Sequence, residues 1–330
     1  MKLLIAKDSV RKLIPLLIAM VALAVFGSTQ SEHFLTPQNL NNMFQQIAVL
    51  GVLAVGQTIL MVAGQLDLSV GSAVSLFSVV GAKLLVAGAS EGEVVVVALA
   101  LGLAVGLLIG LIVAVTRVQP FILTLGALSV FAGIALILSN QQPISVGLAF
   151  VELSLGNVLG LSAPAVVFIG LCLAAAMFLA FTTPGRNAYA VGSNAEAAYL
   201  AGISIAGVKI LLYGINGILV GLASVMLLAR VGSGDPNGGV GLELQVITAV
   251  VLGGATLSGG RGTMLGTFLA VFLLGLISNT LNIVGVPNSY ERLVFGGVLI
   301  MAVVYSALDD LRHTSDIPLG RQLARMLIRR

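Results

Sequence analysis

Long apolar runs dominate this chain, and very few charged side chains interrupt them. Only 9% of the 330 residues are Asp, Glu, Lys or Arg, whereas 58% are hydrophobic. A soluble domain carries about 25% charged residues, so this chain has too few to cover a surface that faces water. The sequence therefore predicts an all-α, polytopic integral membrane protein.

Ten segments are apolar enough to cross a bilayer as helices, each of which needs roughly 20 residues. They lie near 13–27, 43–63, 68–88, 94–116, 120–139, 164–182, 207–230, 244–258, 263–284 and 291–308. We expect a single transmembrane domain over 13–308. A cytoplasmic N-terminus (1–12) precedes it, and a basic cytoplasmic tail (309–330) follows it.

The lysines and arginines fit this layout when both termini are cytoplasmic. Of the 16, all except Lys83, Arg230 and Arg292 then lie on the cytoplasmic side, as the positive-inside rule requires. The long outer segments 28–42 and 140–163 contain neither residue type. The start of the chain also resembles a signal peptide, but no A-x-A cleavage site follows it.

Asp67 is the most unusual polar residue, because it lies between two apolar runs. An aspartate at mid-bilayer costs about 2.5–3.5 kcal/mol on insertion scales, so Asp67 should face protein, water or the membrane interface. Gly64 and Ser69 suggest a break in the helix, with Asp67 capping the next one. The alternative is a role in the solute pathway or its gate. The two are compatible, since broken helices are tolerated where they are buried or line a cavity.

Uncharged amides and hydroxyls supply most of the other polarity within the spans. Such groups can hydrogen-bond a neutral, polyhydroxylated solute, or they can hold helices together. Asp67 is nearly alone as a carboxylate inside the membrane, which argues against internal ion coupling. The candidates for the pathway or its gate are Gln57, Gly64, Gln65, Asp67, Ser69, Asn216, Gln245, Thr248, Gly253, Gly254 and Asn279.

Glycines spaced four residues apart indicate close packing of two predicted helices. Gly102, Gly106 and Gly110 form two overlapping G-x-x-x-G steps, and Gly217 and Gly221 repeat the spacing. Glycines at this spacing let helix backbones approach closely. The pattern predicts packing and carries no functional message.

Residues 183–206 form the largest internal cytoplasmic loop of this layout. Asn194 is a favoured N-cap residue, and 195–200 is a helix-favouring segment that ends before Gly202. A bare connector needs no such helix. We therefore expect this helix to dock a cytoplasmic partner, the alternative being a helix that lies on the membrane surface.

The sequence shows no chemistry of its own. It contains no G-x-x-x-x-G-K-[ST] phosphate loop and no metal-ligand or nucleophile–base cluster. The glycine-rich segment 252–263 is better explained by close backbone packing or by a hinge at an inner gate. We expect a chain that is not an enzyme and binds no cofactor and no nucleic acid.

Four segments carry a family resemblance: 64–72 (GQLDLSVGS), 120–126 (PFILTLG), 185–203 and 247–263. Together they resemble the permease subunits of bacterial ATP-binding-cassette importers for monosaccharides, of the ribose, xylose and galactose type, with the autoinducer-2 permeases as close relatives. One departure is Gln65, where that family more often has a second glycine.

The resemblance implies a type II importer-like permease in the bacterial inner membrane. A second permease, either identical or homologous, would complete the pathway for a neutral monosaccharide. A periplasmic or lipid-anchored sugar-binding protein would deliver this sugar. A pair of ATPase subunits, which would hold ATP and magnesium, would dock on Arg186, Asn194, Glu196, Ala197, Ala198 and Gly202.

Two other functions remain open from the sequence. A related importer permease could carry branched-chain amino acids or nucleosides, although zwitterionic amino acids would favour charged partners within the membrane. A self-sufficient secondary transporter or channel would move solute without a motor.

Overall fold

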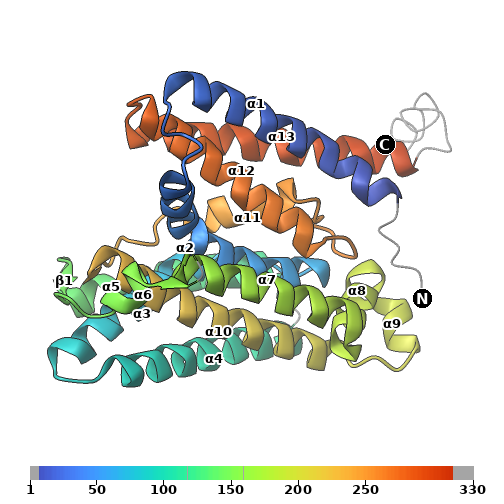
Figure 1. The fold of residues 1–330 in the computed structure, drawn as a ribbon. Coiled ribbons are helices and arrows are strands. Elements are labelled where there is room, and N and C mark those ends of the chain that lie inside the picture. The colour runs from blue at the N-terminus through green and yellow to red at the C-terminus, as the bar shows by residue number, and fades with distance from the viewer. Residues whose placement is uncertain (1–6, 117, 159, 315–330) are drawn as a thin grey trace.

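The computed structural model describes residues 7–116, 118–158 and 160–314, which form a helical bundle with two small β-ladders (Figure 1). The helices are α1 (Lys7–Gln30), α2 (Pro37–Val62), α3 (Val70–Val86), α4 (Glu91–Thr116), α5 (Pro120–Ser139), α6 (Val151–Leu155), α7 (Ala163–Phe181), α8 (Thr183–Ser193), α9 (Ala195–Leu200), α10 (Ile205–Val231), α11 (Leu242–Leu252), α12 (Met264–Ile283) and α13 (Asn288–Thr314). The strands are β1 (Ile144–Ser145), β2 (Asn157–Val158), β3 (Leu161–Ser162) and β4 (Ser233–Gly234).

Both ladders are antiparallel and two residues long. In the first, β1 pairs with β4, so that Ile144 lies opposite Gly234. In the second, β2 pairs with β3, so that Asn157 lies opposite Ser162. The architecture is therefore helical almost throughout the described residues, as the composition predicts.

Six of the described helices are long and apolar enough to cross a membrane, namely α2, α4, α5, α7, α10 and α12. Shorter apolar helices cover Ile14–Gln30, Val70–Val86 and Leu242–Leu252. The segments predicted as spans fall on these nine helices and on α13. One boundary is wrong: α11 ends at Leu252 and does not continue to 258, because Gly253 and Gly254 follow, and Gly254 adopts a φ of +91°.

Local sequence explains where several helices begin. Pro120 and Pro164 lie in the first turns of α5 and α7, where the missing N–H would have no helical partner anyway. Before α12, the Thr263 hydroxyl accepts a hydrogen bond from the Gly266 N–H at 3.1 Å. This bond satisfies one of the free donors at the helix start.

The predicted glycine packing is confirmed between α4 and α10. A Cβ on Gly102 would lie 2.1 Å from the carbonyl oxygen of Gly217, and a Cβ on Gly106 would lie 2.3 Å from that of Tyr213. Such distances leave no room for any side chain, so the two backbones touch. We call this contact the glycine seam, formed by Gly102, Gly106, Gly217 and Gly221.

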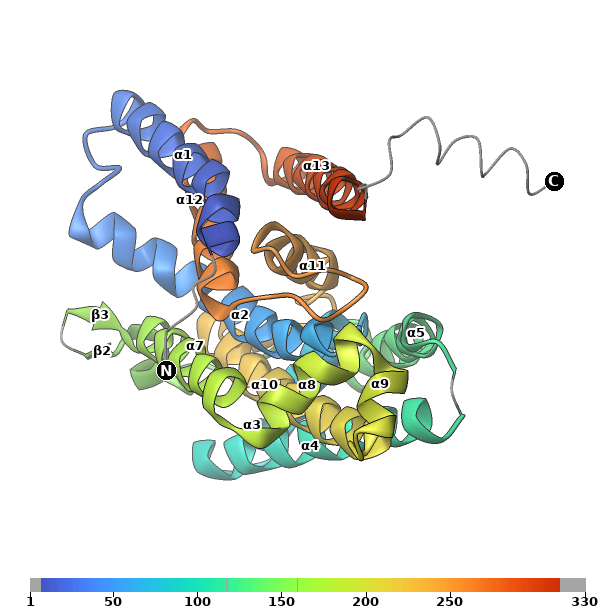
Figure 2. The same cartoon turned by 90° about the vertical axis from the view of Figure 1, so that its right-hand side faces the viewer.

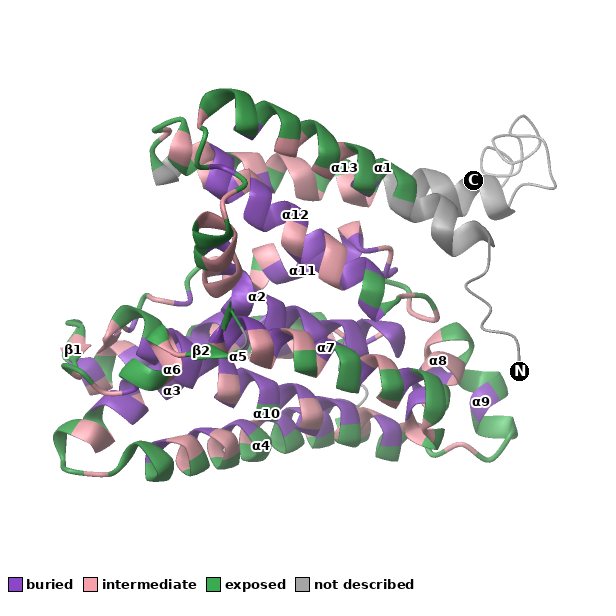
Figure 3. Cartoon of the chain, viewed as in Figure 1, coloured by how far each residue is buried: buried purple, intermediate pink, exposed green. Residues whose placement is uncertain are grey.

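Helix α2 occupies the middle of the bundle and is buried along most of its length (Figures 2 and 3). It packs against α7, α10, α11 and α12. By contrast, α4 and α5 turn large apolar side chains outward, including Val115 at 70% and Ile137 at 76% exposed. Large exposed apolar side chains are a liability in water, so the outer faces of α4 and α5 are suited to an apolar surrounding.

The two ends of the bundle differ in what they carry. Helices α8 and α9 lie at one end, together with the start of α1 and the end of α13, whereas β1 and α6 lie at the other (Figure 1). We refer to these as the inner end and the outer end, after the sequence-based expectation that both termini are cytoplasmic.

Candidate functional site

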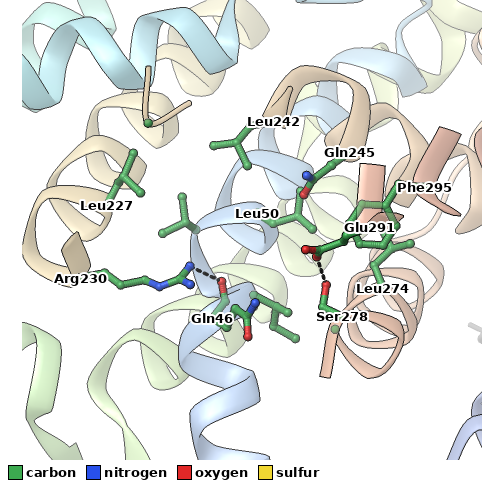
Figure 4. Close-up of a pocket in the computed structure, with 14 residues that line it drawn as sticks. Gln46, Leu50, Leu227, Arg230, Leu242, Gln245, Leu274, Ser278, Glu291 and Phe295 are labelled. Atoms are coloured by element: carbon green, nitrogen blue, oxygen red, sulfur yellow. Dashed lines mark hydrogen bonds between the residues drawn. The ribbon is translucent and has the colours of Figure 1, made fainter. Parts of the chain in front are cut away.

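A cavity of about 130 Å³ lies among α2, α10, α11, α12 and α13 (Figure 4). Its walls are mainly apolar, and its polar lining consists of Gln46, Arg230, Gln245, Ser278 and Glu291. Apolar walls with a few placed polar groups are the usual form of a small-molecule site.

Hydrogen bonds orient the charged groups of this cavity. The Arg230 Nη1 donates to the backbone carbonyl of Gln46 at 3.0 Å, and the Ser278 hydroxyl donates to Glu291. In Figure 4, Arg230 and Glu291 approach the cavity from opposite sides, and the Gln245 amide also points into it. The cavity thus offers both donors and acceptors while its formal charges cancel.

Among the predicted pathway residues, Gln245 lines this cavity. The predicted pathway residues do not include Arg230, in the last turn of α10, or Glu291, in the first turn of α13. Among the described residues, Asp67 is the only Asp or Glu side chain that is buried, at 5% exposed, in agreement with the prediction that it is nearly alone. Glu291 lines the cavity, and Glu243 in the first turn of α11 is only partly exposed. A signal was present, since both Glu243 and Glu291 lie in the first turn of a helix.

Asp67 lies in the tight connection between α2 and α3 and is 5% exposed. Its Oδ1 accepts hydrogen bonds from the Ser69 N–H at 2.9 Å and from the Ser69 hydroxyl at 2.6 Å. Its Oδ2 accepts a bond from the Asn216 Nδ2 of α10 at 2.9 Å. Both oxygens therefore have partners, as a buried carboxylate requires.

The backbone of the same connection is also held from both sides. The Tyr213 hydroxyl of α10 donates to the Leu66 carbonyl at 2.9 Å. The fully buried Gln57 of α2, with its amide oriented to suit both neighbours, donates to the Asp67 carbonyl at 3.2 Å and accepts from the Asp67 N–H at 3.3 Å. We call Gln57, Asp67, Ser69, Tyr213 and Asn216 the Asp67 network. It is a packed polar joint between helices, apart from the cavity lining.

The prediction that Asp67 caps the next helix is wrong in its detail. Ser69 is the residue before α3, and its side chain makes no capping bond. The Asp67 carboxylate accepts the N–H of Ser69 itself, so it stabilises the turn that precedes the helix. The cause is the length of the turn, because the helix begins at Val70 rather than at 68.

The other predicted pathway residues make local contacts. Thr248 donates to the Leu244 carbonyl one turn earlier at 2.7 Å, and a Cβ on Gly253 would lie 2.6 Å from the Gly266 carbonyl carbon. Gln65 donates to the Gly64 carbonyl at 3.1 Å. The remaining three are Gly64 and Gly254, which both adopt a positive φ in turns, and Asn279, which is 8% exposed.

The inner end carries the helix that the sequence predicts over 195–200. Helix α9 covers Ala195–Leu200, and the Asn194 side chain accepts a hydrogen bond from the Ala197 N–H at 2.9 Å. Gly202, with a φ of +82°, follows the helix. The helix and its cap are confirmed. Helix α8, which precedes α9 directly, was not predicted.

Exposure separates the residues of α9 into two groups. Glu196 and Ala197 are exposed, but Ala198 is 4% exposed and packs inward, so it cannot meet a partner. The predicted docking residues do not include Tyr199 and Leu200, which are 67% and 79% exposed. Large exposed apolar side chains at a helix end are typical of an interaction surface.

A groove of about 1080 Å³ runs beside α9. Glu196, Tyr199 and Gly202 line one part of it, and Lys209 of α10 lines another. Arg186 of α8 is exposed and donates to the Phe181 carbonyl at 3.2 Å. Within the described ranges, no group of three or more His, Cys, Asp or Glu side chains could hold a metal ion.

Comparison with known proteins assigns the chain to a group. Residues 39–303 match a family described as "Branched-chain amino acid transport system / permease component". The ribose import permease protein RbsC of Escherichia coli K12 is 38% identical over 293 residues, covering 87% of this chain and 91% of its own. The L-arabinose ABC transporter permease protein AraH of Azospirillum brasilense is 36% identical, covering 87% and 86%.

A third relative extends the range of sugars. The D-allose transport system permease protein AlsC of Escherichia coli K12 is 33% identical over 297 residues, covering 88% of this chain and 89% of its own. No solved structure matches the chain.

Proposed function

This chain belongs to the branched-chain amino acid transport system / permease component family, and we propose that it is the membrane subunit of an ATP-driven importer for a neutral monosaccharide. The observation that carries this proposal is the similarity, over most of the chain, to permeases named for ribose, L-arabinose and D-allose. Those names span five- and six-carbon sugars, so the solute class is proposed and the individual sugar is not.

The membrane layout follows from the same proposal. The chain lies in the bacterial inner membrane, with the inner end in the cytoplasm. The six long helices are apolar and long enough to cross the bilayer, and α1, α3, α13 and the shorter α11, together with the loop that follows it, make up the rest of the proposed ten membrane segments, with both termini cytoplasmic. The cationic side chains then obey the positive-inside rule, and α8 and α9 lie on the side where a cytoplasmic motor works.

The cavity beside Gln245 is part of the sugar pathway. Its amides, hydroxyl and opposed charges can hydrogen-bond sugar hydroxyls, and Phe295 supplies an apolar face for the ring carbons. Because the formal charges of Arg230 and Glu291 cancel, this part of the pathway presents no net charge to the solute. For the candidate residues outside this cavity, including Asn279 and Thr248, a role in the pathway stays a prediction.

The energy for transport comes from partners. A pair of ATPase subunits binds ATP and magnesium and docks on the inner end, a second permease copy or homologue completes the pathway, and a periplasmic sugar-binding protein supplies solute. Alternating access then results from motion of the docked helices. The chain itself carries out no hydrolysis.

A substrate panel tests the proposed solute class. The complex of this chain with its ATPase and binding protein is placed in vesicles, and ATP-dependent uptake of labelled pentoses, hexoses, leucine and a nucleoside is compared. Uptake of one or more sugars without leucine or nucleoside uptake supports the proposal. Preferential leucine uptake would instead support the solute that the family description names.

Charge reversal at the docking helix tests where the motor acts. Glu196 is exposed on α9 and lines the groove, so Glu196→Lys is expected to lower sugar uptake at least about tenfold, since like-charge juxtaposition at an interface costs several kcal/mol. ATP-dependent uptake and ATPase binding to the permease are measured together.

The matched control is Glu152→Lys, which makes the same charge change on exposed α6 at the outer end. It should leave ATPase binding unchanged. If Glu196→Lys binds the ATPase and transports normally, α9 is not the docking helix.

A further inference from the structure

The C-terminal end of α8 lies directly against two turns from distant parts of the chain. One is the end of α2, at Val62 to Gly64, and the other is the loop after α11, at Ser258 to Gly262. The Gly260 N–H donates to the Val62 carbonyl at 2.8 Å, and a Cβ on Gly192 of α8 would lie 2.0 Å from that same carbonyl oxygen. We call the segments 62–64, 189–193 and 258–262 the inner joint.

Glycines bring these three backbones into contact. A Cβ on Gly259, which has a φ of +87°, would lie 2.7 Å from the Gly64 nitrogen. A Cβ on Gly260, which has a φ of +75°, would lie 2.6 Å from the Ser193 hydroxyl. No flexible side chain separates the segments, so a displacement of one is transmitted directly to the others.

One side chain crosses the joint. The Tyr189 hydroxyl of α8 donates to the Gly262 carbonyl at 2.8 Å, which links residues 73 positions apart. Burial raises the pKa of the Tyr189 phenol, so the hydroxyl stays protonated and remains a donor at neutral pH.

The loop held by Tyr189 continues directly from α11, whose other end reaches the cavity. Leu242 and Gln245 in the first turns of α11 line the cavity, and the helix ends at Leu252. Eleven residues at 1.5 Å per residue give a rod about 16 Å long. Because residues 253–257 connect the joint to the end of α11, a displacement of the joint is passed to α11 and to its cavity end.

The second turn of the joint leads to a second element. The α2–α3 connection begins at Ala63 and includes Asp67, and hydrogen bonds of the Asp67 network hold this connection on Tyr213 and Asn216 of α10. The joint therefore contacts the inner ends of the two connections that follow α2 and α11. Both connections adjoin short apolar helices, α3 and α11.

We propose that Tyr189 is a positioning residue for transport, and that the inner joint transmits motion of α8 and α9 to the cavity through α11. This inference rests on the proposed function and deepens it. In this proposal, the backbone contacts among 62–64, 189–193 and 258–262 transmit the motion of α8 to the cavity. The Tyr189–Gly262 hydrogen bond holds the loop after α11 on α8.

Tyr189→Phe tests the proposal because it removes only the hydroxyl. The full complex in vesicles is assayed for sugar uptake and for ATP hydrolysed at the same time. We expect ATP hydrolysis to continue while uptake falls about fivefold, which is the change in an equilibrium constant that the loss of one hydrogen bond causes. The amount of ATP consumed per sugar then rises about fivefold. The matched control, Tyr290→Phe, removes an exposed hydroxyl remote from the joint and should leave the ratio unchanged.

Gly192→Ala tests the backbone contact independently. Its methyl group would collide with the Val62 carbonyl, whereas the control Gly170→Ala has open space around the new methyl group. Gly192→Ala should raise ATP consumed per sugar more than Tyr189→Phe does, and Gly170→Ala should not raise it.

The ratio separates a coupling role from a structural one. If Tyr189→Phe leaves ATP consumed per sugar unchanged, even with both rates lowered together, the proposal is overturned, because loss of folded complex lowers both rates equally. Absence of ATP-driven uptake in the unaltered complex would overturn the proposed function itself, and the inference with it.

Discussion

Gly217→Leu is expected to prevent stable folding of the chain. A Cβ at this position would lie 2.0 Å from the Gly102 carbonyl oxygen, and α4 and α10 would have to separate along the glycine seam. Overpacking a filled core costs about 1–3 kcal/mol and occasionally more; with backbone on the opposing side unable to give way, we expect about 3 kcal/mol or more. The measurement is the thermal midpoint of the purified chain in detergent, with the yield of monodisperse protein.

The matched control for the seam is Gly126→Leu. Gly126 lies on α5 with no atom within 4 Å of a built Cβ, so the same change adds apolar surface without a collision. We expect its midpoint to stay close to that of the unaltered chain. A normal midpoint for Gly217→Leu would show that α4 and α10 do not meet at these glycines.

Asp67→Ala is expected to cause the second-largest loss, about 3 kcal/mol of stability with a strong loss of transport. The change leaves the Ser69 N–H and the Asn216 amide without their acceptor, and each buried donor left unsatisfied costs about 1–3 kcal/mol. Asp67→Asn should be milder, since its Oδ1 can still accept from Ser69. Midpoint and uptake are measured for both variants.

A donor–acceptor exchange isolates the Asp67–Asn216 contact. In Asp67→Asn the new Nδ2 faces the Asn216 Nδ2 across the 2.9 Å contact, and the Asn216 amide has to turn over to offer its Oδ1, which has no hydrogen-bond partner in the structure. Adding Asn216→Asp supplies an acceptor without that rearrangement. The double variant should recover at least half of the lost midpoint. If the midpoint loss of the double variant equals the sum of the losses of Asp67→Asn and Asn216→Asp, the contact between the two side chains does not stabilise the turn.

Features set by residues close in sequence could be predicted. The spacing of Gly102 and Gly106 and of Gly217 and Gly221 predicts the seam, because four-residue steps place glycines on one helix face. Asn194 and the segment 195–200 predict α9, because capping depends on a residue and the N–H groups just after it.

Features built from distant residues could not be predicted in the same way. Asp67 attracts attention by its charge, but its partner Asn216 is 149 positions away, so nothing local indicates which helix receives it. The cavity takes Arg230 from α10 and Glu291 from α13. Their positions near helix ends suggest surface charges, and only the fold places both beside one cavity.

The inner joint illustrates the same limit. The glycines of 252–263 predict close packing or a hinge, and close packing is what the structure contains at Gly253, Gly259 and Gly260. Gly259 and Gly260 pack against α8, a helix that was not predicted. Its apolar content is low, and its contacts are with turns that lie far away along the chain.

The most direct test of the central account is sugar uptake against a gradient by vesicles of known composition. Vesicles with this chain, its ATPase, its binding protein and ATP should accumulate monosaccharide above the external concentration, and omitting any one of these components should abolish accumulation. Accumulation by vesicles that contain this chain alone would contradict the account, since the transport energy would then come from within the chain.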